Sequence, residues 1–486
     1  MNDELLDVLI IGAGLSGIGM ACHLVQECPN KSFAVLERRD AIGGTWDLFR
    51  YPGIRSDTDM FSFGYAFRPW YQPTVMGDGP TIRDYIADTA REFGVEKKIR
   101  FGMKIVAADW SSVEQQWTVK ALHEASGETR SYRCRFLVPC TGYYNYDAGF
   151  QPDFPGQEQF KGLRIHPQHW PESLDYAGKK VVVIGSGATA VTLVPAMAKK
   201  AAHVTLLQRS PSYIVSVPGV DAISSMLARV LPDSIVYALA RRRSIALQRG
   251  LYLACRRWPG AVRRLLLSQV RRRAGKGVDM KHFTPSYKPW DQRLCAVPDA
   301  DLFEQLKSGK ASVVTDRIAS FTETGIRLAS GAQLDADIII SATGLNIQML
   351  GGMALSVDGV AKNLRDHLTY KGVLVQGMPN IGVIFGYSNA PWTLKADLAA
   401  AYLCRLFKHM EANGQCVAMP VGSEGSEVDG SILGSLSSGY VQRGDAILPR
   451  QGSKYPWHVS HHYGRDTDVL LNQPIDDEWL RFEPSA

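Results

Sequence analysis

The sequence lacks a long apolar run and a paired-cysteine motif, and its first residues do not resemble a secretory leader. No segment approaches 18 consecutive apolar residues, so we expect no transmembrane helix. Residues 1–4 are Met-Asn-Asp-Glu and lead directly into an expected strand, which predicts a cytoplasmic protein without a secretory signal. The eight cysteines include no Cys-x-x-Cys pair. This scatter is typical of free thiols in a reducing compartment and argues against a disulfide reductase.

The sequence also lacks metal-ligating residues at suitable spacing and a nucleic-acid-binding motif. His169, His461 and His462 have no other ligands at suitable spacing, so we expect no metal site. Residues 221–276 hold 13 Lys and Arg against two acids, a net charge of +11 in a chain whose total is +6. The remaining residues therefore carry a net charge of −5, and the basic character belongs to one segment. No nucleic-acid-binding fold accompanies this charge, so we expect no nucleic-acid partner.

The chain is too long for one hydrophobic core. Its 486 residues, 45% hydrophobic and 21% charged, have the composition of a globular protein of two or three domains. The order of expected strands and helices predicts an α/β fold with two Rossmann-like dinucleotide-binding domains, the second carrying a helical insertion. The expected segments are 1–145 and 373–486 for the first domain, 146–212 and 290–372 for the second, and 213–289 for the basic helical insertion.

The first glycine-rich turn follows the apolar run 8–11. Gly12, Gly14 and Gly17 have the spacing that seats a pyrophosphate on a helix N-terminus after a strand. The next expected strand ends in Glu37, 20 residues after Gly17. A carboxylate at this place accepts hydrogen bonds from ribose hydroxyls and repels a 2′-phosphate. The unit therefore predicts an FAD site, and ordinary turn glycines are the alternative interpretation.

The second glycine-rich turn lies about 170 residues later and leads to a different chemistry. It follows the apolar run 181–184, and its matching strand ends in Gln208 and a cation rather than in an acid. A guanidinium grips phosphate oxygens in bidentate fashion, which favours a 2′-phosphate. The unit predicts an NADPH site, with solvated strand ends as the alternative. The candidate residues are Gly185, Gly187, Thr189, Ala190, Arg209 and Ser210.

Two further stretches carry many fixed positions in order. Residues 43–57 read GGTWDLFRYPGIRSD and fit the pattern G-G-x-W-x-x-x-x-Y-P-G-x-x-x-D. Residues 160–171 read FKGLRIHPQHWP and fit F-x-G-x-x-x-H-x-x-x-W-P. In these stretches the chain resembles the class B flavoprotein monooxygenases, in particular the Baeyer–Villiger monooxygenases. The resemblance extends over nearly the whole chain and is nearest to the ethionamide-activating type.

The resemblance implies a mechanism and a set of site residues. In that family NADPH reduces FAD, O2 adds at the flavin C4a carbon, and the resulting peroxide attacks a carbonyl. Arg293 matches the arginine that keeps the peroxide anionic, and Asp57 matches the carboxylate that orients this arginine. His166 lies in the link between the two nucleotide domains, where we expect a conformational role ahead of proton transfer. The flavin-side positions are Gly44, Thr45, Trp46 and Asp57.

These expectations combine into one leading function and two alternatives. The leading function is an FAD- and NADPH-dependent monooxygenase that uses O2 to convert small lipophilic ketones to esters or lactones and also oxidises thioethers and thioamides. The alternatives are an S- or N-oxygenating flavin monooxygenase and a membrane-peripheral flavin-binding redox protein without oxygenation. For residues 221–276 we expect a solvated helical wall beside the substrate cavity, and contact with an anionic membrane is the second interpretation.

Overall fold

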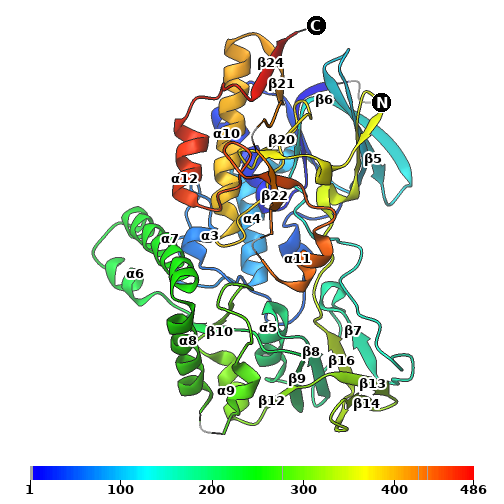
Figure 1. Cartoon of the computed structure of the whole chain (residues 1–486), viewed down its shortest axis with the longest axis vertical. Coiled ribbons are helices and arrows are strands. Elements are labelled where there is room, and N and C mark those ends of the chain that lie inside the picture. The colour runs from blue at the N-terminus through cyan, green and yellow to red at the C-terminus, as the bar shows by residue number, and fades with distance from the viewer. Residues whose placement is uncertain (1–3, 276, 425, 435, 486) are drawn as a thin grey trace.

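The two main β-sheets of the protein lie toward opposite ends of its long axis, with helices packed around them (Figure 1). The computed structural model describes residues 4–275, 277–424, 426–434 and 436–485. The arrangement confirms the expected α/β fold, with two Rossmann-like parts and a helical insertion.

The first sheet has eight strands in the order β18-β17-β4-β5-β6-β1-β2-β3. β1 pairs in parallel with β2 and β6, whereas β4, β5 and β6 form an antiparallel meander. Alternate residues of β1 enter two different cores, one containing Val8 and Ile10 and the other Leu9 and Ile11. The strands are β1 (Leu5–Ile11), β2 (Phe33–Leu36), β3 (Ile99–Arg100), β4 (Met103–Ser111), β5 (Gln116–His123), β6 (Glu128–Pro139), β17 (Ala354–Val357) and β18 (Val360–Lys362).

The second sheet has five strands, all parallel, in the order β12-β9-β8-β16-β7. Its central strands are continuous runs of Val and Ile, which is typical of strands that helices cover on both faces. The strands are β7 (Leu163–Ile165), β8 (Lys180–Ile184), β9 (His203–Gln208), β12 (Ala311–Thr315) and β16 (Ile338–Ser341).

A helix follows each glycine turn. α1 (Leu15–Glu27) begins after β1, and α5 (Ala188–Met197) begins after β8. α10 (Trp392–Ala412) packs beside α1, and most of its residues are buried, which brings the last quarter of the chain into the first core. The same regions contain α2 (Thr45–Leu48), α3 (Met60–Phe63), α4 (Gly79–Glu92), α9 (Asp301–Lys307), α11 (Gly439–Gly444) and α12 (Tyr463–Thr467).

A helical insertion lies between β10 (Ile214–Val217) and β11 (Cys295–Pro298), which pair in parallel. It consists of α6 (Ala222–Leu227), α7 (Asp233–Arg257) and α8 (Pro259–Ala274), which form one side of the molecule in Figure 1. The inner face of α7 is anchored to α3. Arg241 Nη1 donates hydrogen bonds to the carbonyl oxygens of Phe61 at 2.9 Å and of Gly64 at 2.8 Å.

The five-segment domain division stays a proposal. Within it, the last boundary is better placed before Ala354 than at residue 372, because β17 pairs with β4 in the first sheet. The sequence does not indicate that the chain rejoins the first sheet here, because β17 and β18 are short and follow the second nucleotide unit closely. Within the described ranges, no helix is both long and apolar enough to span a bilayer.

Candidate functional site

A cavity of about 360 Å³ is lined by residues from both Rossmann-like parts. The ends of β1 and β2, the loop after β6, the start of α5 and the loop before β11 all contribute to its wall. Such crevices at the carboxyl ends of parallel strands are where open α/β sheets bind ligands. Of the residues predicted from the sequence, the cavity wall includes Gly12, Gly14, Glu37, Gly44, Thr45, Trp46, Asp57, Thr189 and Arg293.

The first glycine turn has a backbone that only glycine fits. Gly12 has φ +103°, and a Cβ there would lie 2.8 Å from the carbonyl oxygen of Cys140. A Cβ on Gly17 would lie 1.8 Å from the carbonyl oxygen of Gly12, so this residue lets α1 pack closely on the turn. Gly14 is the N-cap of α1, and Gly44 faces it with φ +56°. The unpaired N–H groups at the start of α1 therefore open onto the cavity, as an anion requires.

Glu37 lies at the end of β2 and fixes this turn. Its two carboxylate oxygens accept hydrogen bonds from the backbone N–H groups of Ala13 at 2.6 Å and of Arg39 at 2.8 Å. Burial raises the pKa of Glu37, and these two hydrogen bonds oppose the shift. Each oxygen keeps a further lone pair, so the side chain is able to accept ribose hydroxyls on the cavity side.

The second glycine turn repeats the geometry at the start of α5. Gly185 has φ +146°, and a Cβ there would lie 2.3 Å from the carbonyl oxygen of Ala342. Gly187 is the N-cap of α5 and is exposed, and a Cβ there would meet nothing within 4 Å. Ala190 is buried inside the helix, so it packs the helix rather than facing a ligand. Thr189 lies on the cavity wall.

Arg209 and Ser210 are exposed directly after β9 and do not line the cavity. With the residues of the described ranges, Arg209 makes neither an ion pair nor a hydrogen bond. A guanidinium left without a protein partner at the end of the second strand is available to a phosphate. The NADPH contact predicted for both residues stays a proposal.

Arg293 lies on the cavity wall, half-buried, and is held by backbone carbonyls. Its Nε donates to the carbonyl oxygen of Ser388 at 3.1 Å, and its Nη2 donates to that of Tyr387 at 3.4 Å. Burial alone lowers the pKa of a guanidinium, but nearby Tyr143, Tyr440 and Asp57 raise the pKa of Arg293 above its ordinary value. The side chain therefore carries a permanent positive charge at the cavity.

Asp57 lines the same cavity as Arg293 and is exposed. Across the described residues, neither an ion pair nor a hydrogen bond joins the two side chains. Asp57 acts on Arg293 through its charge, as one of the groups that raise the pKa of the guanidinium. The structure thus brings the predicted pair to one site without direct contact, and the orienting role of Asp57 stays a proposal.

His166 lies away from the cavity wall, at the end of β7. Its Nδ1 accepts a hydrogen bond from the backbone N–H of Gln168 at 3.2 Å, so its Nε2 carries the proton and donates to the carbonyl oxygen of Gly344 at 3.2 Å. Burial lowers the pKa of His166. With both ring nitrogens engaged, the residue connects the link to the loop after β16, which favours the conformational role.

Several aromatic residues of the site were missed by sequence reasoning. Tyr143 and Tyr144 follow the strand that closes the first unit, and their hydroxyl groups lie 2.9 Å apart. Trp392 stacks on Tyr143 with ring centroids 5.3 Å apart. Tyr143 and Tyr144 directly follow the Thr-Gly turn after β6, and that position was the available signal. Tyr387 comes from a part of the chain without a motif.

The chain is similar to proteins of one family along most of its length. Residues 6–351 match the family described as flavin-binding monooxygenase-like. The putative FAD-containing monooxygenase MymA of Mycobacterium tuberculosis is 62% identical over 490 residues, covering 100% of this chain and 99% of its own. The FAD-containing monooxygenase EthA of the same organism is 50% identical over 481 residues, covering 99% of this chain and 98% of its own.

Solved structures give the same answer at the level of the fold. Oxidized steroid monooxygenase bound to NADP aligns with a TM-score of 0.79 at 20% identity, covering 99% of this chain and 100% of that one. Cyclohexanone monooxygenase in an open crystal structure aligns with a TM-score of 0.76 at 20% identity, over 99% and 100% of the two chains. Because the family match spans most of the chain and one relative is 62% identical over its full length, the chain belongs to the flavin-binding monooxygenase-like family and is a flavoprotein monooxygenase.

Proposed function

We propose that the chain binds FAD at the first glycine turn and NADPH at the second, and inserts one oxygen atom of O2 beside a ketone carbonyl. The products are esters or lactones, and soft sulfur in thioethers and thioamides is a second class of substrate. The observation that carries this proposal is the cavity itself. Its wall combines residues of the first nucleotide turn and of the start of α5 with the half-buried cation of Arg293.

The residues of the cavity fit FAD. The glycine backbones of Gly12 and Gly14 leave room where side chains would block a pyrophosphate, and the start of α1 supplies N–H donors. Glu37 suits an adenosine ribose, while Trp392 and Tyr143 offer a stacked aromatic wall further along the cavity. When bound and reduced by NADPH, FAD supplies the oxygen-activating chemistry, and the protein supplies position and charge.

Arg293 provides the charge that this chemistry needs. Because carbonyl oxygens rather than a carboxylate hold it, the guanidinium keeps its full positive charge toward the cavity. A fixed cation stabilises negative charge that develops on oxygen far better in a water-poor site than in bulk solvent. Asp57 is proposed to orient this cation once the nucleotides are bound, and His166 to couple the link to the movement of the second domain.

The NADPH site is proposed at the start of α5, with Gly185 shaping the turn and Gly187 leaving space for the pyrophosphate. Arg209 and Ser210 are proposed to bind the 2′-phosphate. Gln208 stands where the first unit has the acid Glu37, and the guanidinium of Arg209 beside it has no partner among the described residues, which favours NADPH over NADH.

The test uses purified protein and a substrate that carries both a ketone and a thioether. We expect a yellow flavoprotein that consumes O2 with NADPH and forms an ester, with sulfoxide as a second product. If the protein forms sulfoxide but no ester from this substrate, and no ester from simple linear and cyclic ketones, the S-oxygenating alternative applies. NADPH oxidation without any oxygenated product would leave the redox-protein alternative.

We further propose that the outer face of the insertion contacts an anionic membrane at the cytoplasmic side, where lipophilic substrates are found. On α7, Ile235, Leu239, Arg242, Arg249 and Leu253 are exposed and spaced by 3, 4 or 7 residues, so they share one face of the helix. Arginines that share a helix face with exposed apolar side chains are typical of a surface that lies in a lipid headgroup layer.

The neighbouring helices extend this surface. Four side chains outside α7 are each at least 61% exposed: Met226 of α6, Val230 after α6, Trp258 between α7 and α8, and Leu265 of α8. A second copy of the chain is a poor partner, because two such faces would oppose arginine to arginine. The inner face, anchored through Arg241 to α3, adjoins the cavity, since Phe63 of α3 is part of the cavity wall.

Vesicle sedimentation tests this contact. We expect binding to phosphatidylglycerol vesicles at low salt, weaker binding at high salt, and none to phosphatidylcholine vesicles. The double variant Arg242→Glu/Arg249→Glu should lose binding, whereas Arg317→Glu/Arg327→Glu on the opposite part of the chain should keep it. Absence of binding at low salt, or self-association without vesicle binding, would overturn the proposal.

A further inference from the structure

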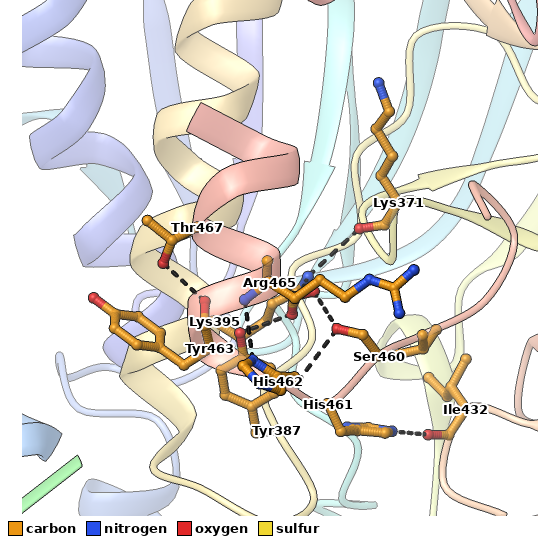
Figure 2. Close-up of polar contacts among 12 residues, drawn as sticks. Lys371, Tyr387, Lys395, Ile432, Ser460, His461, His462, Tyr463, Arg465 and Thr467 are labelled. Carbon is orange, nitrogen blue, oxygen red and sulfur yellow. Dashed lines mark hydrogen bonds and ion pairs between the residues drawn. The ribbon is translucent and has the colours of Figure 1, made fainter. Parts of the chain in front are cut away.

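A buried cluster of charged and polar side chains lies next to the segment that holds Arg293. One of its members lines the cavity, and the others do not. Lys395 Nζ of α10 and Asp466 Oδ2 of α12 are 3.0 Å apart, and both residues are less than 10% exposed. The hydroxyl of Tyr387 donates to the same carboxylate oxygen at 2.7 Å. Figure 2 shows Lys395, Tyr387 and Ser460 converging beside the start of α12. Tyr387 also lines the cavity, so it connects the cluster to the site.

The charges of this cluster are settled by its contacts. Burial alone would raise the pKa of Asp466, but Lys395 and the hydrogen bonds from Ser460 and Tyr387 bring this pKa below its ordinary value. Burial raises the pKa of Tyr387 well above its ordinary value, so its hydroxyl keeps its proton. The cluster is therefore an ion pair with a neutral tyrosine donor. Removing one partner of a buried ion pair is costly, because the other charge is left without compensation.

The same C-terminal segment holds the two residues that follow Tyr387. Ser388 Oγ lies 3.4 Å from His461 Nδ1, and Asn389 Nδ2 donates to the carbonyl oxygen of His461 at 2.9 Å. His461 Nε2 in turn donates to the carbonyl oxygen of Ile432 at 2.9 Å, which Figure 2 also shows. Residues 387–389 are thus fixed from the C-terminal tail at three consecutive positions.

These residues are the ones that hold Arg293. Both acceptors of its guanidinium are main-chain carbonyl oxygens, of Tyr387 at 3.4 Å and of Ser388 at 3.1 Å. A main-chain carbonyl group moves only when the backbone moves. Its position therefore depends on the contacts that fix the backbone of residues 387 and 388. In this protein the hydroxyl of Tyr387 is bonded to Asp466, which is paired with Lys395, and these contacts fix the backbone at residue 387.

We propose that Tyr387, Asp466 and Lys395 form a positioning unit that sets the place of the Arg293 guanidinium in the cavity. The inference rests on the proposed function, in which this cation acts on oxygen chemistry at FAD. The side chains of the three residues touch neither the reacting atoms nor the guanidinium of Arg293, which contacts only the main-chain carbonyl oxygen of Tyr387. They act through the main chain of residues 387 and 388, so they are positioning residues and not catalytic ones.

The chain contains a matched control for this unit. A second set has the same composition: Tyr370 and Lys371, which are buried, and Asp477, which is half-buried. The hydroxyl of Tyr370 donates to Asp477 Oδ2 at 2.6 Å, and Lys371 Nζ lies 3.1 Å from the same oxygen. None of these three residues lines the cavity or contacts Arg293. The two sets meet at one point, where Lys395 Nζ lies 3.5 Å from the carbonyl oxygen of Lys371, and the Tyr370 hydroxyl is not part of that contact. Loss of this hydroxyl should therefore cost stability of the same kind without moving the cation.

The experiment compares Tyr387→Phe with Tyr370→Phe in the full-length, FAD-loaded protein. We expect both variants to lose similar thermal stability. Only Tyr387→Phe should lower the oxygenated product formed per NADPH consumed, by about fivefold or more, because a cation that is misplaced by a fraction of an ångström no longer supports the reaction. Equal product yields in the two variants, or equal losses in both, would overturn the proposal.

A second readout does not depend on oxygenation. A nearby positive charge makes bound FAD easier to reduce, so Tyr387→Phe should shift the midpoint potential of the flavin to more negative values. The midpoint potential of the flavin in Tyr370→Phe should equal that in the wild type. If the wild type forms no oxygenated product, the proposed function fails, yet this potential still tests the positioning unit. Potentials that match in both variants and the wild type would overturn the positioning role.

Discussion

Arg293 Nε donates a hydrogen bond to the carbonyl oxygen of Ser388 at 3.1 Å, across 95 residues of sequence. The donor belongs to the loop that leads from the helical insertion back into the second Rossmann-like part, and the acceptor precedes α10 of the first. One bond thus joins the two halves of the site. It also leaves the guanidinium charge unneutralised, since a carbonyl oxygen is not an anion.

The two glycines of the second turn should respond differently to alanine. In Gly185→Ala, the Cβ would lie 2.3 Å from the carbonyl oxygen of Ala342 at φ +146°, so we expect a loss of stability of about 2 kcal/mol or more. In Gly187→Ala, the Cβ meets no protein atom within 4 Å, so stability should stay near that of the wild type. The KM for NADPH should nevertheless rise about tenfold, because the methyl group occupies space proposed for the pyrophosphate.

Thermal unfolding and steady-state kinetics of the two variants check this contrast. Gly250→Ala serves as the control, because a Cβ there also meets nothing within 4 Å and the residue lies in α7, away from the turn. Unchanged NADPH affinity in Gly187→Ala would remove the second turn from the nucleotide site.

Arg209→Gln should reduce the preference for NADPH over NADH. The guanidinium has no partner within the described part of the chain, so its removal costs no ion pair and little stability. We expect kcat/KM for NADPH to fall about tenfold or more, through loss of a charge-assisted contact with the 2′-phosphate, while kcat/KM for NADH stays the same. The exposed Arg327 offers a matched control, Arg327→Gln, which should leave both cofactors unaffected. Equal losses with NADPH and NADH would contradict the assignment.

His461 should make the stability of the protein depend on pH. Burial lowers the pKa of His461 to about 4, against 6.5 for an ordinary histidine. Between these values the unfolded chain binds a proton that the folded chain does not, so stability is full above pH 6.5 and falls as the pH drops toward 4. From pH 7 to pH 5 the wild type should lose roughly 2 kcal/mol more than His461→Gln.

Urea unfolding at the two pH values measures this difference. The exposed His169 provides the control, His169→Gln, which should follow the wild type at both values. A wild type and a His461→Gln variant with the same pH dependence would show that the buried imidazole does not resist protonation in the folded state.

The fold and the glycine turns were predictable because each depends on local sequence. A strand, a tight turn and a helix start lie within a dozen residues around Gly12 and again around Gly185, and φ values of +103° and +146° demand glycine there. Glu37 was predictable for the same reason, since a fixed number of residues separates it from the turn. The resemblance to a known family placed Arg293 and Asp57 in one site, and both line the cavity.

The supports of Arg293 were not predictable, because they are brought together by the tertiary fold. Tyr387 comes from the segment before α10, Lys395 from α10 and Asp466 from α12, and their contact depends on how α10 and α12 pack. The return of β17 to the first sheet was missed for a similar reason. A strand of four residues has no periodicity that reveals its partner. The sequence also could not show whether Asp57 and Arg293 are in direct contact, because this depends on the positions of their side chains in the folded protein.

In the proposed function, the charge of Arg293 directs activated oxygen onto the substrate. The most direct measurement is the amount of ester formed per NADPH consumed by Arg293→Ala, with a lipophilic ketone as substrate and hydrogen peroxide quantified in parallel. We predict that the variant still binds FAD and oxidises NADPH, that ester falls by about 100-fold or more, and that hydrogen peroxide accounts for the O2 consumed. Ester formation near the wild-type yield in Arg293→Ala would show that oxygen insertion does not need the charge of Arg293.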